Sequence, residues 1–575
     1  MKIRCVEIAG FRGINELIWA PAEHINCLIG AGDAGKTTIL DAIELALAGR
    51  YQAIFDDADF FEGRHDQPIE ITVTIGDLPE AFKALTKYGE HLRGWDAKNR
   101  QIVDEPDEES GLEYVLSVRL TVDKTLEPKW NLYTDRFVDD IRSERNLAFE
   151  DRQNIAPTRL GVYTDRHFAW GRQSILTRLT GNDRVGGEVL ADVSRAARRQ
   201  FASCAETIFE KTINRIPALA RPVGVKVSEN ICARLDVQGV SLNSGGVSLH
   251  DGDIPLRLLG TGSSRLLVAA LQDSAAEAVP FSLLDEVEHG LEPHRISRLL
   301  RYLKCKRCNP QPQVFLTTHS PVTLEELSIG DITIVRREAS TGKVTVISAK
   351  REGFDGQAQL RKTPSAYLSR AVLVCEGKTE VGVVRGLDQY WTYLEREPLA
   401  TAGIWAANGG GKDDAPKMAR YFHNLGYRTA LLLDNDKDPS DGTILSELNK
   451  LGMTILRWEK GKATEDVLFQ DIDDEGTMRL LELMEQNEDL ATIPDQVNSR
   501  ADQKLVNGWA DLKTKRADKV VRGCLASCSK NHGWIKNRMS LAESIGQEVL
   551  GPELKKLKGE NAACIAALRS WIDSE

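Results

Sequence analysis

The chain has 575 residues, of which 42% are hydrophobic and 28% are charged, and its formal net charge is −11. A chain of this length and ordinary globular composition exceeds a single hydrophobic core, so we expect about two to four domains. The negative charge argues against a generally basic coat for nucleic acid, while it leaves room for a local basic groove or a metal site that gathers carboxylates.

The sequence pattern predicts neither a signal peptide nor a membrane span. The N-terminal stretch MKIRCVEIAGFRGI is interrupted by charge and unlike a signal peptide, and no run approaches about 18 apolar residues, the length of a membrane span. The ten cysteines are scattered along the chain, which suits reduced thiols. We therefore expect a cytoplasmic protein with no membrane partner.

A phosphate-binding loop is predicted near the N-terminus. Lys2 to Ile8 alternates as a first strand, and a turn at Gly10 to Ile14 follows it. After the apolar run Ile25 to Ile29, the stretch Gly30 to Thr37 reads GAGDAGKT and fits G-x-x-x-x-G-K-[ST]. In such a loop, backbone N–H groups surround phosphates at a helix N-terminus, the lysine reaches the β/γ-phosphates and the hydroxyl sits on Mg²⁺. The expected nucleotide contacts are Gly30, Gly32, Gly35, Lys36, Thr37 and Thr38, with Thr37 also on the metal.

The elements after this loop change type along the chain. An apolar helical face runs from Leu40 to Leu47. Pro68 to Ile75 and Tyr114 to Val122 alternate at period two, which predicts antiparallel strands of a β-lobe. The charged stretch Lys98 to Gly111 between them predicts a surface loop or excursion.

A helical insertion is predicted from Gln173 to Leu219, where the sequence is rich in Arg and Ala and lacks strand-like alternation. An insertion of this kind is more often an arm or a dimerisation element than a catalytic one. Strands are expected to resume near Val223.

A glycine-rich turn forms the next motif. Leu258 to Arg265 reads LLGTGSSR and leads into an apolar helix. Backbone N–H groups at such a helix N-terminus can bind an anion. The expected contacts are Gly260, Gly262 and Ser263.

Two apolar strands then deliver polar residues at their carboxyl ends. Phe281 to Leu284 runs directly into Asp285 and Glu286. In a P-loop ATPase the first of these acids holds Mg²⁺ and the second orients or activates the attacking water. Val314 to Thr318 delivers His319 in the same way.

Four motifs follow one another along the chain: the P-loop, the glycine-rich turn at Gly260 to Ser263, the Asp285-Glu286 pair and His319. This order resembles the ABC-type ATPase heads of the SMC/RecF/Rad50 group, in which the glycine-rich turn is called the signature, over roughly residues 1–350. The resemblance implies that the signature of one subunit caps the ATP held by another, so we expect a homodimer or higher homo-oligomer. It also implies a nucleotide-proximal basic residue in the first turn, for which Arg12 is the candidate; a solvated turn arginine is the alternative. The family signature commonly has Gln where this chain has Ser264.

A second candidate site follows Pro364. The unbroken apolar run Ala371 to Cys375, typical of a doubly covered parallel strand, ends in EGKTE, from Glu376 to Glu380. Ala430 to Leu433 ends in Asp-Asn-Asp, from Asp434 to Asp436. Two buried strands thus bring acids to one edge of a sheet, where α/β sites are built. Clustered carboxylates repel one another, and their natural partner is Mg²⁺ or Mn²⁺.

This acidic pattern resembles the Toprim fold of topoisomerases, primases and some nucleases. Glu376 matches the first acid of the motif, and Asp434 and Asp436 match the pair. Glu465, after the strand Thr454 to Trp458, resembles the further acid that OLD (overcoming lysogenization defect) nucleases add for a second metal. Two metals would stabilise the attacking and leaving oxygens of phosphodiester hydrolysis. The expected metal ligands are Glu376, Glu380, Asp434, Asp436 and Glu465, in addition to Thr37 and Asp285 at the nucleotide.

A single chain that joins an ABC-type head to a Toprim domain resembles the OLD nucleases over nearly its whole length. The family also implies a catalytic lysine near the C-terminus, for which Lys536 is the first candidate and Lys530 the second; a solvated surface lysine is the alternative. Relatives in the Gabija system and among retron effectors imply a role against phage. They also imply DNA as substrate, and a helicase or a retron reverse transcriptase with its nucleic acid as candidate partners.

Together these features predict an α/β protein with an ABC/SMC-like P-loop head, a helical dimerisation insertion and a Toprim domain with helical additions. The expected bounds are 1–172 and 223–360 for the head, 173–222 for the insertion and 366–575 for the Toprim part. The charged segment Asp471 to Asp495 predicts a solvated helical insertion. The expected function is an ATP-hydrolysing, metal-dependent DNA endonuclease; the alternatives are a non-nucleolytic ATP-driven DNA clamp and, less compatible with the head, topoisomerase or primase chemistry.

Overall fold

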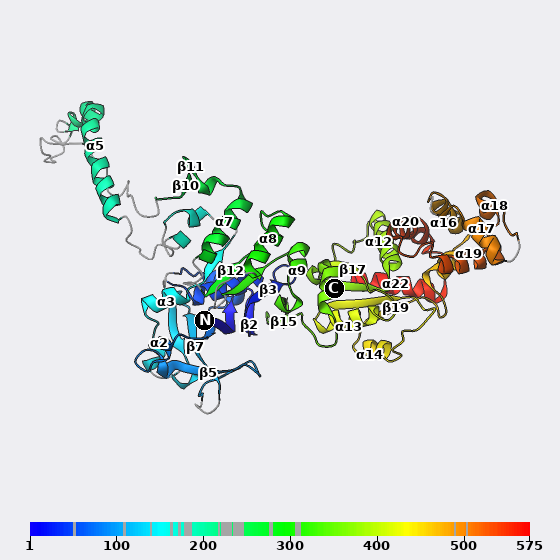
Figure 1. Cartoon of the computed structure of the whole chain (residues 1–575), viewed down its shortest axis with the longest axis horizontal. Coiled ribbons are helices and arrows are strands. Elements are labelled where there is room, and N and C mark those ends of the chain that lie inside the picture. The colour runs from blue at the N-terminus through cyan, green and yellow to red at the C-terminus, as the bar shows by residue number, and fades with distance from the viewer. Residues whose placement is uncertain are drawn as a thin grey trace. The chain divides into compact units, whose positions relative to one another are not determined.

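The computed structural model describes residues 1–49, 53–106, 111–137, 141–161, 165–170, 174–176, 187–216, 219, 233, 247–274, 280–304, 312–487, 490–501 and 504–574 (Figure 1). These residues form two compact units. The first unit comprises Met1–Arg12, Glu16–Asn26 and Thr37–Thr318, and the second comprises Gly13–Asn15, Cys27–Lys36 and His319–Glu575. Among the described residues, no helix is long and apolar enough to cross a membrane.

The first unit contains a seven-stranded sheet in the order β2-β1-β4-β7-β5-β6, with β8 paired to β7. Its strands are β1 (Lys2–Phe11), β2 (Ile14–Trp19), β4 (Ile69–Gly76), β5 (Leu92–Asp96), β6 (Gln101–Val103), β7 (Glu113–Val122) and β8 (Pro128–Tyr133). The predicted alternating strands are confirmed as β4 and β7, which pair antiparallel. The predicted surface loop or excursion Lys98 to Gly111 contains a short strand, because β6 pairs antiparallel with β5; residues 107–110 lie outside the described part of the chain. Backbone pairing forms this strand although its side chains are mostly exposed.

This unit also contains the short antiparallel pair β10 (His250–Asp251) and β11 (Ile254–Pro255), and three parallel strands with β12 in the centre. The parallel strands are β9 (Thr158–Leu160), β12 (Phe281–Leu284) and β13 (Gln313–Thr317). The helices are α1 (Lys36–Ala46), α2 (Glu80–Lys83), α3 (Phe149–Ile155), α5 (Gly187–Ile213), α7 (Thr261–Ser274) and α8 (Pro293–Lys304). The 27-residue α5 confirms helix within the predicted insertion; residues 177–186 and 220–232, including Val223, lie outside the described part of the chain.

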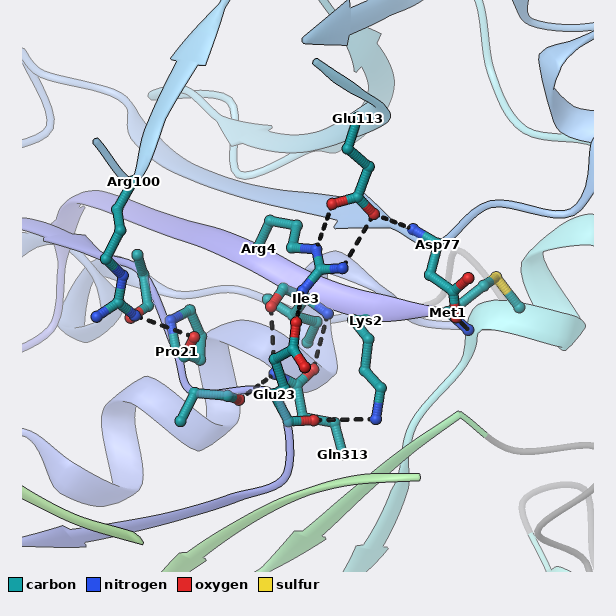
Figure 2. A network of polar contacts seen from close by, with 12 residues as sticks. Met1, Lys2, Ile3, Arg4, Pro21, Glu23, Asp77, Arg100, Glu113 and Gln313 are labelled. Atoms are coloured by element: carbon teal, nitrogen blue, oxygen red, sulfur yellow. Dashed lines mark hydrogen bonds and ion pairs between the residues drawn. The ribbon is translucent and has the colours of Figure 1, made fainter. Parts of the chain in front are cut away.

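Gln313 ties the first strand to the parallel strands (Figure 2). Its side chain is fully buried at the start of β13, where Oε1 accepts the Ile3 N–H at 2.7 Å and Nε2 donates to the carbonyls of Ile3 and Ala22. Beside it, Arg4 pairs with Glu23 and Glu113. A buried amide with all its bonds made fixes the position of β13, the strand that ends beside Asp285.

The second unit begins with β3 (Ile25–Ile29), which is parallel to β14 (Ile332–Arg337); β14 in turn pairs antiparallel with β15 (Val344–Ser348). The short helices α9 (Pro321–Glu326), α10 (Gly356–Lys362) and α11 (Pro364–Leu368) follow along the chain. A separate sheet then has four parallel strands in the order β17-β16-β18-β19. These strands are β16 (Ala371–Cys375), β17 (Ile404–Asn408), β18 (Arg428–Leu433) and β19 (Thr454–Arg457).

Helices surround this four-stranded sheet, with α12 on one side and α13 on the other (Figure 1). The helices of this part are α12 (Lys378–Tyr393), α13 (Ala415–Asn424), α14 (Ile444–Lys450), α15 (Thr464–Asp466), α16 (Asp474–Glu485), α17 (Ile493–Arg500), α18 (Trp509–Thr514), α19 (Lys519–His532), α20 (Met539–Ile545), α21 (Gly551–Glu553) and α22 (Gly559–Asp573). All of β16 is buried, as expected for a doubly covered strand.

The prediction of a solvated insertion at Asp471 to Asp495 is wrong. Leu480, Leu481 and Met484 of α16 are fully buried in the same hydrophobic core as β16. The many acids of this helix lie on its outer side and its apolar residues on the inner side, so the helix is amphipathic, and its high charge alone did not reveal the buried face.

Candidate functional sites

The predicted P-loop lies between β3 and α1. Gly30 has φ 154°, and a Cβ there would stand 2.4 Å from the Val335 carbonyl oxygen of β14, so only glycine fits. A Cβ on Gly32 would meet nothing within 4 Å, so the loop is open at this position. Lys36 is buried, and its Nζ donates to the carbonyls of Gly30 and Ala31 at 3.0 and 2.8 Å. The loop therefore holds its lysine folded back over its own backbone.

The first predicted acid lies beside the P-loop threonine. Thr37 Oγ1 donates to Asp285 Oδ1 at 3.2 Å, and Thr317 Oγ1 donates to the same oxygen at 2.7 Å. Arg159 Nη2 pairs with the other oxygen at 2.9 Å. A hydroxyl and a carboxylate oxygen in contact are the ligand types that Mg²⁺ takes in nucleotide sites, so this pair fits the metal predicted there.

Arg159 was missed by sequence reasoning, because nothing in its local pattern marks it. Its guanidinium also pairs with Asp41 and Glu44 of α1. Arg12 is the residue that the family resemblance predicts to lie near the nucleotide. It pairs with Asp41 at 2.5 Å and with Asp59 at 2.8 Å. These ion pairs tie the first turn to the P-loop helix.

The signature turn lies at the start of α7. A Cβ on Gly262 would meet the Gly290 carbonyl oxygen at 2.4 Å, and Ser263 Oγ accepts from Arg295 Nη1 at 3.2 Å. Gly260 has open space around it. Ser264, at the position of the family glutamine, is buried and donates to the Leu259 carbonyl, so its side chain completes the helix start. Thr38 lies in the first turn of α1, and His319 lies two residues beyond β13.

The second site is built around Thr464, whose side chain is 1% exposed. Its hydroxyl lies 2.9 Å from Asp434 Oδ1 and 3.3 Å from Glu380 Oε1, and its N–H donates to the same Asp434 oxygen. Trp458 Nε1 donates to the hydroxyl at 3.0 Å. Glu376 Oε2 accepts the Asp434 N–H at 3.1 Å. Hydrogen bonds through Thr464 and the Asp434 N–H therefore link three of the five predicted metal ligands, which follow β16, begin α12 and follow β18.

The charge of this cluster is poorly compensated. Burial, with repulsion from Glu380 and Glu376, raises the pKa of Asp434 well above its usual range. Burial, with repulsion from Glu376, raises the pKa of Glu380 to about 7. Burial also raises the pKa values of Glu376 and Glu465. Buried carboxylates that repel one another favour a bound cation.

Asp436 and Glu465, the other two predicted ligands, interact with these acids through their charges. Asp436 is exposed, yet its charge contributes to raising the pKa values of Glu376 and Glu465. In the part of the chain that the structure describes, no three His, Cys, Asp or Glu side chains already converge as a metal cage. The oxygens are instead held by hydrogen bonds from Thr464 and the Asp434 backbone. The donor set, all oxygen and in excess negative charge, fits a hard divalent cation.

Both candidate lysines lie near these acids. The charge of Lys536, in the turn between α19 and α20, opposes the rise in the pKa of Glu376, and that of Lys530 opposes the rise for Glu465. Lys530 also forms an ion pair with the buried Asp466, whose carboxylate accepts the Ala463 N–H. Thr464 and Asp466 were missed by sequence reasoning, although they are the direct neighbours of the predicted ligand Glu465.

The sequence also contains Cys305-x-x-Cys308, and it has Cys524, Cys528 and His532 on one helical stripe, from which four zinc ligands could be assembled, although buried or surface thiols are the commoner case. Cys528 is buried and its thiol donates to the Gln496 carbonyl. Cys305 and Cys308 lie outside the described residues.

Comparison with known proteins identifies both parts of the chain. Residues 25–325 match the family model described as "AAA domain, putative AbiEii toxin, Type IV TA system". Residues 368–436 match the model described as "Overcoming lysogenization defect protein-like, TOPRIM domain". No curated protein has a sequence that matches this chain.

Solved structures of SMC heads are also similar to the chain. An SMC head bound to the C-terminal winged-helix domain of ScpA is 16% identical, covers 60% of this chain and 98% of its own, and has a TM-score of 0.31. The SMC head of Thermotoga maritima is 15% identical, with coverages of 61% and 100% and a TM-score of 0.29. The Pyrococcus furiosus SMC head bound to a ScpA domain is 15% identical, with coverages of 60% and 96% and a TM-score of 0.33.

The AAA model alone spans more than half of the chain, and the Toprim model covers the two strands that carry Glu376 and Asp434. The chain therefore belongs to the OLD family, in which an ATPase domain and a Toprim domain are joined in one polypeptide.

Proposed function

We propose that the protein is an ATP-hydrolysing, divalent-metal-dependent DNA endonuclease. The main support is the group of Glu376, Glu380 and Asp434 around the buried Thr464. A clamp that only binds DNA has no need of a costly concentration of buried negative charge, whereas a metal-dependent phosphodiesterase does.

The residues divide the work as follows. Glu376, Glu380, Asp434, Asp436 and Glu465 would hold Mg²⁺ or Mn²⁺. A metal bound there supplies a nucleophilic water at neutral pH and offsets charge on the phosphate. Thr464 orients the oxygens of Asp434 and Glu380 toward one another. Lys536, with Lys530 as the alternative, places positive charge where the phosphate gains negative charge.

ATP would contact the P-loop residues and the signature described above. Glu286 would orient the attacking water, His319 would lie beside the γ-phosphate, and Arg12 would support the P-loop helix. Because the signature caps the ATP of a second copy in related heads, the active ATPase would be a homodimer or larger.

Packing within the second unit supports regulation of DNA cleavage by nucleotide. The close approach of Gly30 to Val335 places the P-loop against β14. The next residue, Arg336, lies over the Tyr427 ring at 3.9 Å, and Tyr427 directly precedes β18, which ends at Leu433 beside Asp434. Tyr421 of α13 donates to the Ala349 carbonyl at 2.9 Å. Contacts between packed side chains thus connect the P-loop to β18 of the four-stranded sheet. A rearrangement of the P-loop would be transmitted to that sheet through them.

A role in anti-phage defence belongs to the same proposal. Its support is the family match, since the Toprim model is named for a lysogenization phenotype. The partners that fit are DNA and the product of a neighbouring gene, such as a helicase or a retron reverse transcriptase with its nucleic acid.

Metal binding should be visible in stability as well as in cleavage. Glu380 has its pKa raised from 4.5 to about 7 in the fold, so over that window the unfolded chain is ionised while the folded chain holds the proton. The stability of metal-free protein should therefore fall as pH rises from about 4.5 to 7 and stay low above it. Because the cation needs the ionised carboxylates, Mg²⁺ should raise the melting temperature above about pH 7.5 and have little effect below about pH 5.

Calorimetry with Mg²⁺ or EDTA checks this stability, and a plasmid assay checks that EDTA blocks nicking. Equal melting temperatures with and without the metal at high pH would contradict the proposed site.

Assembly gives a further expected result. Multi-angle light scattering at micromolar concentration should give at least twice the mass of one chain with ATP present, because the signature acts on a second copy. A single-chain mass both with and without ATP would remove the dimeric ATPase from the proposal.

A further inference from the structure

Arg265 is the largest fully buried side chain among the described residues, with 0% exposure. It lies on α7, three residues after Gly262 of the signature. A buried guanidinium is costly unless it is well paired. Its Nη2 donates to two backbone carbonyls, those of Asp285 and Glu286, both at 3.0 Å. The guanidinium is thus directed at the peptide groups of the acids proposed for ATP hydrolysis.

The backbone that Arg265 holds is strained. Glu286 has φ 44°, in the left-handed region that a non-glycine residue adopts at a cost. Its N–H donates to Thr317 Oγ1 at 2.8 Å, while its carbonyl accepts from Arg265. Held from both sides, the residue keeps its side chain exposed, where an attacking water can be reached.

The same helix contacts the other end of this turn. The close approach of Gly262 to the Gly290 carbonyl leaves no room for a Cβ. Helix α7 therefore contacts both ends of the segment from Asp285 to Gly290. Arg265 bonds to the first residues of this segment, and Gly262 packs against its last residue. A shift of the signature turn should move the peptide of Glu286 with it, because Arg265 is fully buried and Gly262 has no free space toward the Gly290 carbonyl.

A purely structural role explains Arg265 poorly. Its Nε and Nη1 have no hydrogen-bond partner in the described part of the chain. An apolar side chain of similar volume would fill the space without the desolvation cost, and such replacements are often neutral or stabilising. Burial lowers the pKa of Arg265, and the charges of Glu288, Asp285 and Glu286 oppose that change. The guanidinium therefore adds positive charge beside the acids that face nucleotide.

We propose that Arg265 is a positioning residue for ATP hydrolysis, which fixes the Glu286 peptide and makes its placement depend on the signature helix. This inference rests on the proposed ATPase function. The hydrogen bonds of Arg265 go to the Asp285-Glu286 turn and not to the P-loop or the signature glycines, so it should affect the chemical step and leave nucleotide binding unchanged.

The test uses the full chain with Arg265→Met and Arg265→Lys, and Arg298→Met as a matched control on the exposed side of α8. Arg265→Met should lower kcat for ATP about 10–100-fold, the effect typical of groups that orient a catalytic ligand, with KM and the Kd for a fluorescent ATP analogue unchanged. Arg265→Lys, which keeps a donor and a charge, should recover part of the loss. Arg298→Met should match the wild type.

Three kinetic outcomes would overturn the inference: a wild-type kcat for Arg265→Met, a parallel loss of ATP affinity, or an equal loss of kcat in Arg265→Lys. Thermal melting of both variants separates a folding defect from a kinetic one, since a melting temperature lowered along with kcat in Arg265→Met would make the role structural. If the wild type itself does not hydrolyse ATP, the proposed function fails and not this assignment alone.

Discussion

The Asp434→Asn variant is expected to lose metal-dependent DNA cleavage by more than about 100-fold, because groups that merely orient a metal ligand are themselves worth about 10–100-fold. Asn keeps the hydrogen bonds from Thr464 with little change in volume, but it removes the charge that a cation needs. ATP hydrolysis should continue at the wild-type rate, since Asp434 follows β18 of the four-stranded sheet and is not among the residues proposed to bind ATP. Agarose-gel assays of supercoiled plasmid, with ATPase assays on the same preparation, check both parts.

The stability of this variant offers an independent readout. Because burial and repulsion raise the pKa of Asp434, removing its charge should leave the metal-free protein at least as stable as the wild type above about pH 7. Asp441→Asn is the matched control, since Asp441 is exposed and its side chain bonds to Thr443 nearby. Wild-type cleavage by Asp434→Asn, or lost cleavage in Asp441→Asn, would contradict the assignment.

The Lys36→Ala variant should show the opposite pattern. Loss of the P-loop lysine is expected to reduce ATP hydrolysis by about 1,000-fold or more, the scale on which cationic groups act in phosphoryl transfer. Hydrolysis of a phosphodiester by a metal-bound water needs no ATP, so the variant should still cut naked DNA with Mg²⁺ or Mn²⁺. Its cleavage should no longer respond to added ATP.

Lys83→Ala serves as the control for this experiment, because Lys83 lies on the surface helix α2 and pairs with Glu80. A phage-challenge assay should show that Lys36→Ala and Asp434→Asn each abolish protection. If a folded and assembled Lys36→Ala protein cuts no DNA under any nucleotide condition, ATP hydrolysis is obligatory for cleavage and the regulatory proposal is wrong.

Local motifs carried most of what the sequence could predict. The P-loop, the Asp285-Glu286 pair and the Toprim acids each follow a short apolar strand, and strand ends place side chains at a sheet edge by geometry alone. Both ATPase acids and the acids of β16 and β18 accordingly lie at the ends of the strands predicted to carry them.

Residues that act through tertiary contacts could not be predicted in this way. Arg159 reaches Asp285 from a different strand, and Arg265 reaches it from a helix twenty residues earlier. Arg159 has no local pattern, and the stretch LLGTGSSR that ends at Arg265 gives no sign of its contacts, because each role depends on which elements the fold brings together. The burial of α16 was missed for a related reason: its acids dominate the composition, while its apolar face appears only at helical spacing.

The most direct test of two chemistries in one chain measures ATP hydrolysis and Mn²⁺-dependent plasmid cleavage on the same preparations of the wild type, Lys36→Ala and Asp434→Asn. We expect Lys36→Ala to lose only the first activity and Asp434→Asn only the second. Loss of both activities in either folded variant would contradict the assignment of ATP hydrolysis and DNA cleavage to separate sets of residues.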